Sequence, residues 1–258
     1  MQHFLELDNL NAFGLVFMRM LGCVVFNPIL GRRNIPRMYL VAMALVLSLL
    51  VYTYSDLSSI GAINSTVEYI VLLSKEFCVG FVLGFVVSLF SYIIILGGEL
   101  MDLQMGFSMS KIYDPASNVS MSVSATIYNI LFIIMFFSMN GHLTMIRLFL
   151  DLEKVVPYGH VLLGGDIADQ MIAVFCQCTI LAIKLAMPMI GMQFLLEMGV
   201  GILMKAIPQI NVFAVNFQAK IFLGLVLVVA MFSPIMNFIE AMIEGLFSAI
   251  SSVAQLLG

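Results

Sequence analysis

The sequence predicts an all-α membrane protein with about six long hydrophobic helical segments, each long enough to cross a bilayer. Composition is the first indication: 62% of the 258 residues are hydrophobic, only 10% are charged, and the mean hydropathy is +1.10. A typical soluble domain is roughly half apolar and about a quarter charged. The second indication is a series of apolar runs near the roughly 20-residue length that spans a hydrocarbon core. Without repeats or a linker-like tract, we expect residues 1–258 to form a single domain.

The apolar runs follow one another along the whole chain. They lie near Leu10–Leu30, Met38–Tyr54, Val67–Leu96, Thr126–Phe149, Met171–Met204 and Lys220–Ile250. We expect the first run to be retained as a span, because the acidic residues Glu6 and Asp8 before it are unlike a cleavable signal. The last two runs exceed one crossing and contain Pro188 and Pro234, which predict kinked helices or helical hairpins there.

Charge and cysteine content argue against several function classes. Eleven Lys and Arg are scattered among fifteen acidic residues, so no basic patch for nucleic acid is visible. The four cysteines lie within apolar runs, and Cys176 and Cys178 stand two residues apart, which on a helix points them to nearly opposite sides and prevents a shared metal site. We therefore expect packing cysteines, no metal site and no cofactor.

Charged residues inside the runs need an explanation, because each costs roughly 2.5–3.5 kcal/mol at the centre of a membrane helix. They are Arg19, Lys75, Glu76, Arg147, Lys184, Glu197, Glu240 and Glu244. They require partners, snorkelling or a watery cavity. Lys184 precedes Pro188 by four residues, a spacing that fits either a transporter site or a contact with another subunit. Glu240 and Glu244 lie one turn apart and fit an acidic rim or a proton relay.

The central segment from Gly97 to Pro115 differs from its surroundings. Gly97 and Gly98 loosen the backbone and Asp114-Pro115 closes the segment as a turn. Apolar side chains nevertheless recur through it: Met105, Phe107, Met109, Ile112 and Tyr113. An apolar loop at membrane depth must be buried in protein or line a cavity. The segment therefore predicts a deformable hydrophobic constriction, which blocks ions by dewetting.

A series of motifs, taken in order, resembles the FliR/SctT family of type III secretion export-gate proteins. The motifs are Gly106-Phe107-Ser108, Asp114-Pro115-Ala116-Ser117, Asn140-Gly141-His142, Pro208-Gln209-Ile210-Asn211-Val212-Phe213 and Lys220. The resemblance covers nearly the whole chain. It departs from the family at Met109 and Ile112, where many relatives carry phenylalanine, and at Gln218, where many carry proline.

The resemblance implies a non-enzymatic subunit of the flagellar export gate, in the bacterial inner membrane at the basal body. Such a subunit assembles with FliP and FliQ in a helical ring joined by FlhB, through which unfolded flagellar subunits pass. The family's plug of the closed pore corresponds here to Met105, Gly106, Phe107, Met109, Ile112 and Tyr113.

The resemblance also implies residues for structure and assembly. These are Asp114, Pro115, Asn140, Gly141, His142, Glu197, Pro208, Gln209, Asn211, Phe213 and Lys220. We expect Glu197, Lys205, Gln209, Asn211 and Lys220 to face protein or the cytoplasmic vestibule, because interhelical hydrogen bonds hold membrane helices together.

Three alternatives remain open from the sequence. A virulence-type gate subunit of the same family is one. A secondary transporter using Lys184, Glu197 and Glu240 is the second, although no inverted repeat is visible. The third is an intramembrane hydrolase with Ser108 and His142, but Ser110 stands where a nucleophile elbow has its final glycine.

Overall fold

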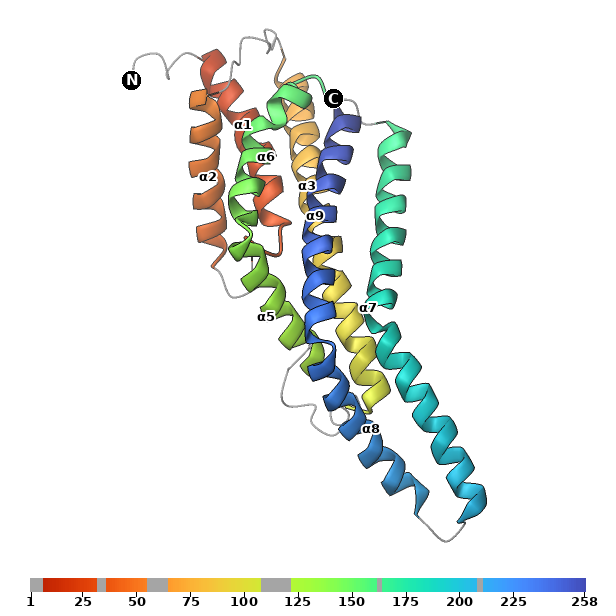
Figure 1. Ribbon diagram of the computed structural model, residues 1–258. Coiled ribbons are helices and arrows are strands. Elements are labelled where there is room, and N and C mark those ends of the chain that lie inside the picture. Colours follow the sequence, from red (N-terminus) through yellow and green to blue (C-terminus); the bar gives the residue numbers. More distant parts are fainter. Residues whose placement is uncertain (1–6, 32–35, 55–64, 108–121, 162–163, 208–210) are drawn as a thin grey trace. The chain divides into compact units, whose positions relative to one another are not determined.

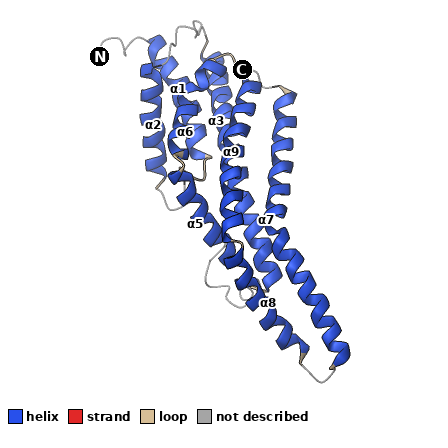
Figure 2. Cartoon of the chain, in the orientation of Figure 1, coloured by secondary structure: helices blue, strands red, loops and turns tan. Residues whose placement is uncertain are grey.

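The computed structural model describes residues 7–31, 36–54, 65–107, 122–161, 164–207 and 211–258. Within these ranges the regular secondary structure is entirely helical (Figure 2), which confirms the predicted fold class. The described helices are α1 (Leu7–Val25), α2 (Arg37–Tyr54), α3 (Thr66–Met105), α5 (Val123–Ser138), α6 (Gly141–Val155), α7 (Gly165–Ala206), α8 (Val212–Ala230) and α9 (Phe232–Leu257) (Figure 1).

The predicted apolar runs correspond to these helices with shifted boundaries. By length and composition α2, α3, α7 and α9 can each cross a membrane, and α5 with α6 would make a fifth span if counted as one. Helix α7 continues through Pro188. The last run is divided between α8 and α9 at Met231, and Pro234 falls in the first turn of α9, where its missing N–H costs nothing.

The central segment begins later than the sequence suggested. Gly97 and Gly98 do not start a loop, because α3 remains helical to Met105. Their role is close packing: a Cβ on Gly98 would lie 2.4 Å from the Ala125 Cα, and a Cβ on Gly97 would lie 2.8 Å from Leu185 Cδ2. The expected backbone loosening at these glycines is therefore wrong.

The chain divides into two compact units, which are described separately here. Unit 1 contains residues 1–90, 137–175 and 243–258, and unit 2 contains residues 91–136 and 176–242.

In unit 1, α1 and α3 approach each other at glycines. A Cβ on Gly22 would lie 2.8 Å from the Phe77 carbonyl oxygen, and a Cβ on Gly80 would lie 2.2 Å from the Arg19 carbonyl oxygen. Small residues at such a contact let two membrane helices come into backbone contact. The Gly80-x-x-x-Gly84 spacing is a visible sequence signal for this contact.

The same contact brings the mid-run charge Arg19 to a partner. Arg19 Nε donates to Glu76 Oε2 at 2.6 Å, and both side chains are fully buried. Arg19 Nη1 donates to the Val156 carbonyl oxygen at 2.7 Å, and the guanidinium carbon lies 3.9 Å from the Tyr158 ring centroid. The Gly159 N–H donates to Glu76 Oε1 at 2.9 Å. The expectation that buried charges in this chain need partners is thus confirmed for this pair.

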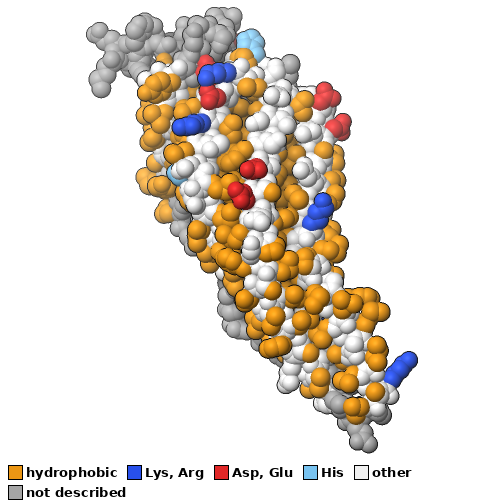
Figure 3. Space-filling model, in the orientation of Figure 1, with side chains coloured by type: hydrophobic (Ala, Val, Ile, Leu, Met, Phe, Trp, Pro, Cys, Tyr) orange, Lys and Arg blue, Asp and Glu red, His pale blue; other side chains and the backbone are white. Residues whose placement is uncertain are grey.

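Much of the chain's surface is apolar. Only 22% of the residues in the most apolar stretch of α2 and 28% of those in α7 are buried within the chain. Hydrophobic side chains cover a large part of the face in Figure 3, and charged side chains are few. Lipid or other subunits must cover such a surface, because isolated soluble proteins rarely expose apolar patches of this extent.

Candidate functional site

The candidate site is the described part of the predicted plug and its surroundings in unit 2. Helix α3 ends at Gly106, whose φ of 82° is a left-handed conformation that glycine adopts without strain. The Gly106 N–H donates to the Leu103 carbonyl and the Phe107 N–H donates to the Asp102 carbonyl, at 3.3 and 3.0 Å. These two bonds form a Schellman motif, so Gly106 ends the helix just before the remaining residues of the predicted plug.

Asp102 holds the two sides of the central segment together. The Ser124 N–H, at the start of α5, donates to both carboxylate oxygens of Asp102 at 3.3 Å, and the Asp102 carboxylate is buried. A carboxylate near a helix N-terminus is favoured by the helix dipole and by the unpaired N–H groups there. The sequence placed Asp102 in the central segment but gave no signal of this capping role.

The root of the predicted plug lies against α8. Met105 is buried, and a Cβ on Gly224 would come within 2.3 Å of its sulfur. A Cβ on Gly106 would lie 3.3 Å from the Phe217 ring. Gly224 and Phe217 thus form a seat for Met105 and Gly106, and nothing in the sequence singled out Gly224.

Helix α7 is tied to α8 beside this seat. Gln193 is fully buried, and its Nε2 donates to the Lys220 carbonyl oxygen at 2.9 Å. The Lys220 ammonium forms an ion pair with the Glu197 carboxylate, with 19% and 47% of the two side chains exposed. Two residues expected from the family motifs are therefore partners of each other. Their expected contacts with other subunits remain predictions.

Asn211 caps α8. Its side-chain oxygen accepts from the Ala214 N–H at 3.4 Å, which satisfies one of the unpaired amides of the first turn. Pro208 and Gln209 lie outside the described residues, as does the side chain of Phe213. A local capping role therefore accounts for asparagine at position 211 before any partner is considered.

The Asn140-Gly141-His142 motif lies in unit 1, between α5 and α6. Asn140 has a left-handed conformation with φ of 56°, which asparagine tolerates better than most residues. Its carbonyl accepts from the Leu143 and Thr144 N–H groups at 3.0 and 3.1 Å. The His142 ring lies 5.0 Å from the Phe137 ring, centroid to centroid. The motif thus separates α5 from α6 and divides the predicted apolar run Thr126–Phe149 between two helices.

Several predicted residues lie outside the described ranges, and others do not contact the seat formed by Gly224 and Phe217. Met109, Ile112, Tyr113, Asp114 and Pro115 belong to the first group, as does Ser108, the nucleophile of the hydrolase alternative. Among the charges of the transporter alternative, Lys184 and Glu240 are exposed, and the structure gives Glu197 a different partner, Lys220.

The cysteine prediction is partly wrong. Cys23 and Cys178 are buried, but Cys78 and Cys176 are exposed on the chain. No group of three or more His, Cys, Asp or Glu that could hold a metal occurs among the residues that the structure describes.

Comparison with known proteins decides the family. Residues 10–246 match the family model described as "Bacterial export proteins, family 1". The chain belongs to this family.

Members of the family with curated names resemble the chain over nearly its whole length. It is 24% identical to the flagellar biosynthetic protein FliR of Escherichia coli over 244 residues, covering 95% of this chain and 93% of the relative. Identity to FliR of Bacillus subtilis is also 24%, over 98% of both chains. Identity to FliR of Pectobacterium carotovorum is 27%, over 92% of this chain and 90% of the relative. The resemblance to a FliR-like protein is therefore confirmed.

Proposed function

We propose that this chain is a non-enzymatic membrane subunit of the flagellar type III export gate, with residues Met105 to Tyr113 plugging the closed channel. The family match, the similarity to FliR along the whole chain and the membrane-length helices support an export role. The observation that carries the plug assignment is the seating of Met105 and Gly106 on α8.

The seat explains how a plug could be both held and released. Asp102, which bonds to Ser124, and Met105, which packs on Gly224, fix the start of the segment. The residues that follow include Met109, Ile112 and Tyr113, which are apolar or aromatic and exclude water from a constriction. Methionine side chains are unbranched and adaptable, so they can re-form contacts after a polypeptide has passed.

Assembly with FliP, FliQ and FlhB in the bacterial inner membrane, at the basal body, completes the proposal. The exposed apolar faces of α2 and α7 support it, because neighbouring helices would cover surface that the chain does not cover itself. Unfolded flagellar subunits are the proposed cargo. The chain would form part of the channel wall and its plug, and it would catalyse no reaction.

Affinity purification of the tagged full-length chain from membranes of its own host tests the assembly. We expect FliP and FliQ to co-purify in a detergent that preserves membrane complexes. Recovery of virulence-type homologues in their place would transfer the same role to a virulence system. Recovery of the chain alone, with solute uptake when it is reconstituted into vesicles, would contradict the proposal and favour a transporter.

A further inference from the structure

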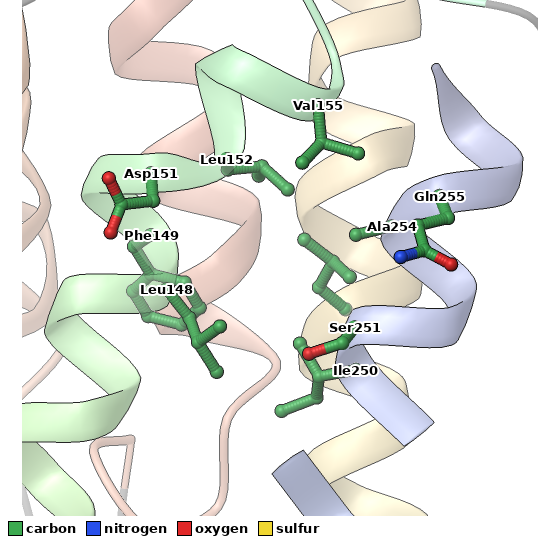
Figure 4. Close-up of a pocket in the computed structure, with 10 residues that line it drawn as sticks. Leu148, Phe149, Asp151, Leu152, Val155, Ile250, Ser251, Ala254 and Gln255 are labelled. Carbon is green, nitrogen blue, oxygen red and sulfur yellow. The ribbon is translucent and has the colours of Figure 1, made fainter. Parts of the chain in front are cut away.

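Unit 1 contains a groove that the plug proposal does not use. A cavity of about 210 Å³ lies between α6 and α9, over α3. Figure 4 shows Leu152 and Val155 of α6 facing Ala254 and Ile250 of α9 across it. The floor is therefore apolar, and polar side chains lie at the edges.

The α6 edge of this groove is polar and carries charge. Asp151 lines the groove, and the exposed residues Thr144, Arg147 and Lys154 share its helix face because successive members of the four lie three or four residues apart. Lys154 forms an ion pair with Asp151. Arg147 has no acidic partner within ion-pair distance among the described residues, so this edge presents an unmatched positive charge.

The α9 edge has the opposite character. Ser251 and Gln255 line the groove, and the exposed residues Ser248 and Glu244 continue the same face of α9 in the preceding turns. The Ser251 hydroxyl donates to the Phe247 carbonyl at 3.0 Å, so it is satisfied within the helix. Glu244 has no basic partner among the described residues, and this edge presents an unmatched negative charge.

Lipid is a poor occupant for a groove with such edges. Acyl chains would fill the apolar floor but offer no hydrogen-bond partner to Arg147 or Glu244. A helix of another protein can fill the floor with aliphatic side chains and offer charges of the opposite sign to both edges. Opposite charges placed in this way also fix the register between partners.

We propose that the groove between α6 and α9 is the docking site for a transmembrane helix of a neighbouring export-apparatus subunit, with a carboxylate of that helix facing Arg147. This inference rests on the proposed function and specifies one contact within the assembly. The partner helix presents aliphatic residues toward Leu152 and Ala254, and a basic or amide side chain toward Glu244.

Site-specific photo-cross-linking in the assembled complex tests the groove. A photoreactive phenylalanine at Gln255 is expected to cross-link to a membrane helix of another subunit, with an Asp or Glu of that helix within about one turn of the attachment point. The same probe in the Arg147→Glu background, where docking should be weakened, and a sample without irradiation are the controls for non-specific capture. Arg147→Glu should lower recovery of the complex at least tenfold, and exchanging the partner's carboxylate for lysine should restore it.

The outcomes separate this inference from the broader function. If the complex co-purifies but Gln255 cross-links only to lipid or to a second copy of the chain, the groove inference is wrong and the gate proposal stands. The same holds if the paired charge exchange fails to restore recovery. If no other subunit co-purifies with the wild-type chain, both proposals fail.

Discussion

Single residues in this chain show how charge is accommodated in an apolar fold. Arg19 and Glu76 are fully buried, and each also bonds to backbone near Tyr158. Burial raises the pKa of the Tyr158 hydroxyl above its ordinary value, so Tyr158 stays neutral and offers its ring face to the guanidinium. The sequence could predict that Arg19 needs a partner. It could not predict that Glu76 is the partner, because helix packing chooses the pair.

Replacing Arg19 alone should destabilise the protein strongly. Arg19→Leu leaves the Glu76 carboxylate buried without its counter-charge, a loss of about 3–5 kcal/mol for pairs of this kind. The double variant Arg19→Leu with Glu76→Leu removes both charges and should recover most of the loss. Thermal unfolding in detergent measures both effects. Equal midpoints for the single variant and the wild type would show that the pair is not the buried contact described here.

Substitution of Asn211 separates capping from assembly. Asn211→Leu removes the acceptor for the Ala214 N–H and should lower the free energy of unfolding by about 1 kcal/mol. The variant should also fail to co-purify FliP and FliQ. Asn211→Asp keeps an N-cap acceptor and is the matched control. If Asn211→Asp assembles normally and Asn211→Leu does not, the cap accounts for the role of this residue. If both variants assemble like the wild type, the family expectation for Asn211 is wrong.

At the scale of elements, glycines decide where helices meet. Gly80 lies at the α1–α3 contact, and an added Cβ would collide with the Arg19 backbone, which cannot move as a side chain tip can. Gly80→Ala should therefore lower the free energy of unfolding by about 1–3 kcal/mol. The change is measured as a lower unfolding midpoint in detergent. Gly191→Ala in α7 is the control, because its added Cβ meets nothing within 4 Å and should instead stabilise the helix by up to about 1 kcal/mol.

The contact between Met105 and Gly224 of α8 predicts a variant that folds normally but lets ions pass through the closed gate. In Gly224→Ala the new methyl would meet the flexible tip of Met105, so Met105 must move while the helix backbone can stay. We expect the assembled gate to pass small ions more readily, measured as sodium or proton influx in energised cells. Gly164→Ala, which lies outside the helices and has nothing within 4 Å of its added Cβ, is the control and should remain tight. A tight gate with Gly224→Ala would contradict the seat.

The sequence predicted the helices more accurately than the contacts between them. Apolar runs marked the helices because hydrophobic length is a local property. The roles of Gly97 and Gly98 were mistaken because glycine in a sequence permits both a loop and a close contact, and only the packed neighbours Leu185 and Ala125 decide between them. The cap from Asp102 to Ser124 spans 22 residues and has no local signal.

At the scale of the whole molecule, the buried charges have partners within the chain, but much of the apolar surface is not covered by the chain itself. The buried charges Arg19 and Glu76 of unit 1 pair with each other and with backbone, whereas the sides of α2 and α7 remain apolar and Arg147 and Glu244 stay exposed on α6 and α9. Burying apolar surface gains about 25 cal/mol per Å² in water, but within a membrane helices associate through packing and hydrogen bonds. Such a surface must be covered by lipid or by other subunits, and the proposed assembly would supply the latter.

The most direct test of this account is the ion conductance of the purified, assembled gate in a planar bilayer, with and without residues 105–113. The account predicts a closed wild-type complex, and steady conductance when Met105 to Tyr113 are deleted while all subunits are still recovered. A deletion complex that assembles fully and stays as tight to ions as the wild type would show that the channel is closed elsewhere.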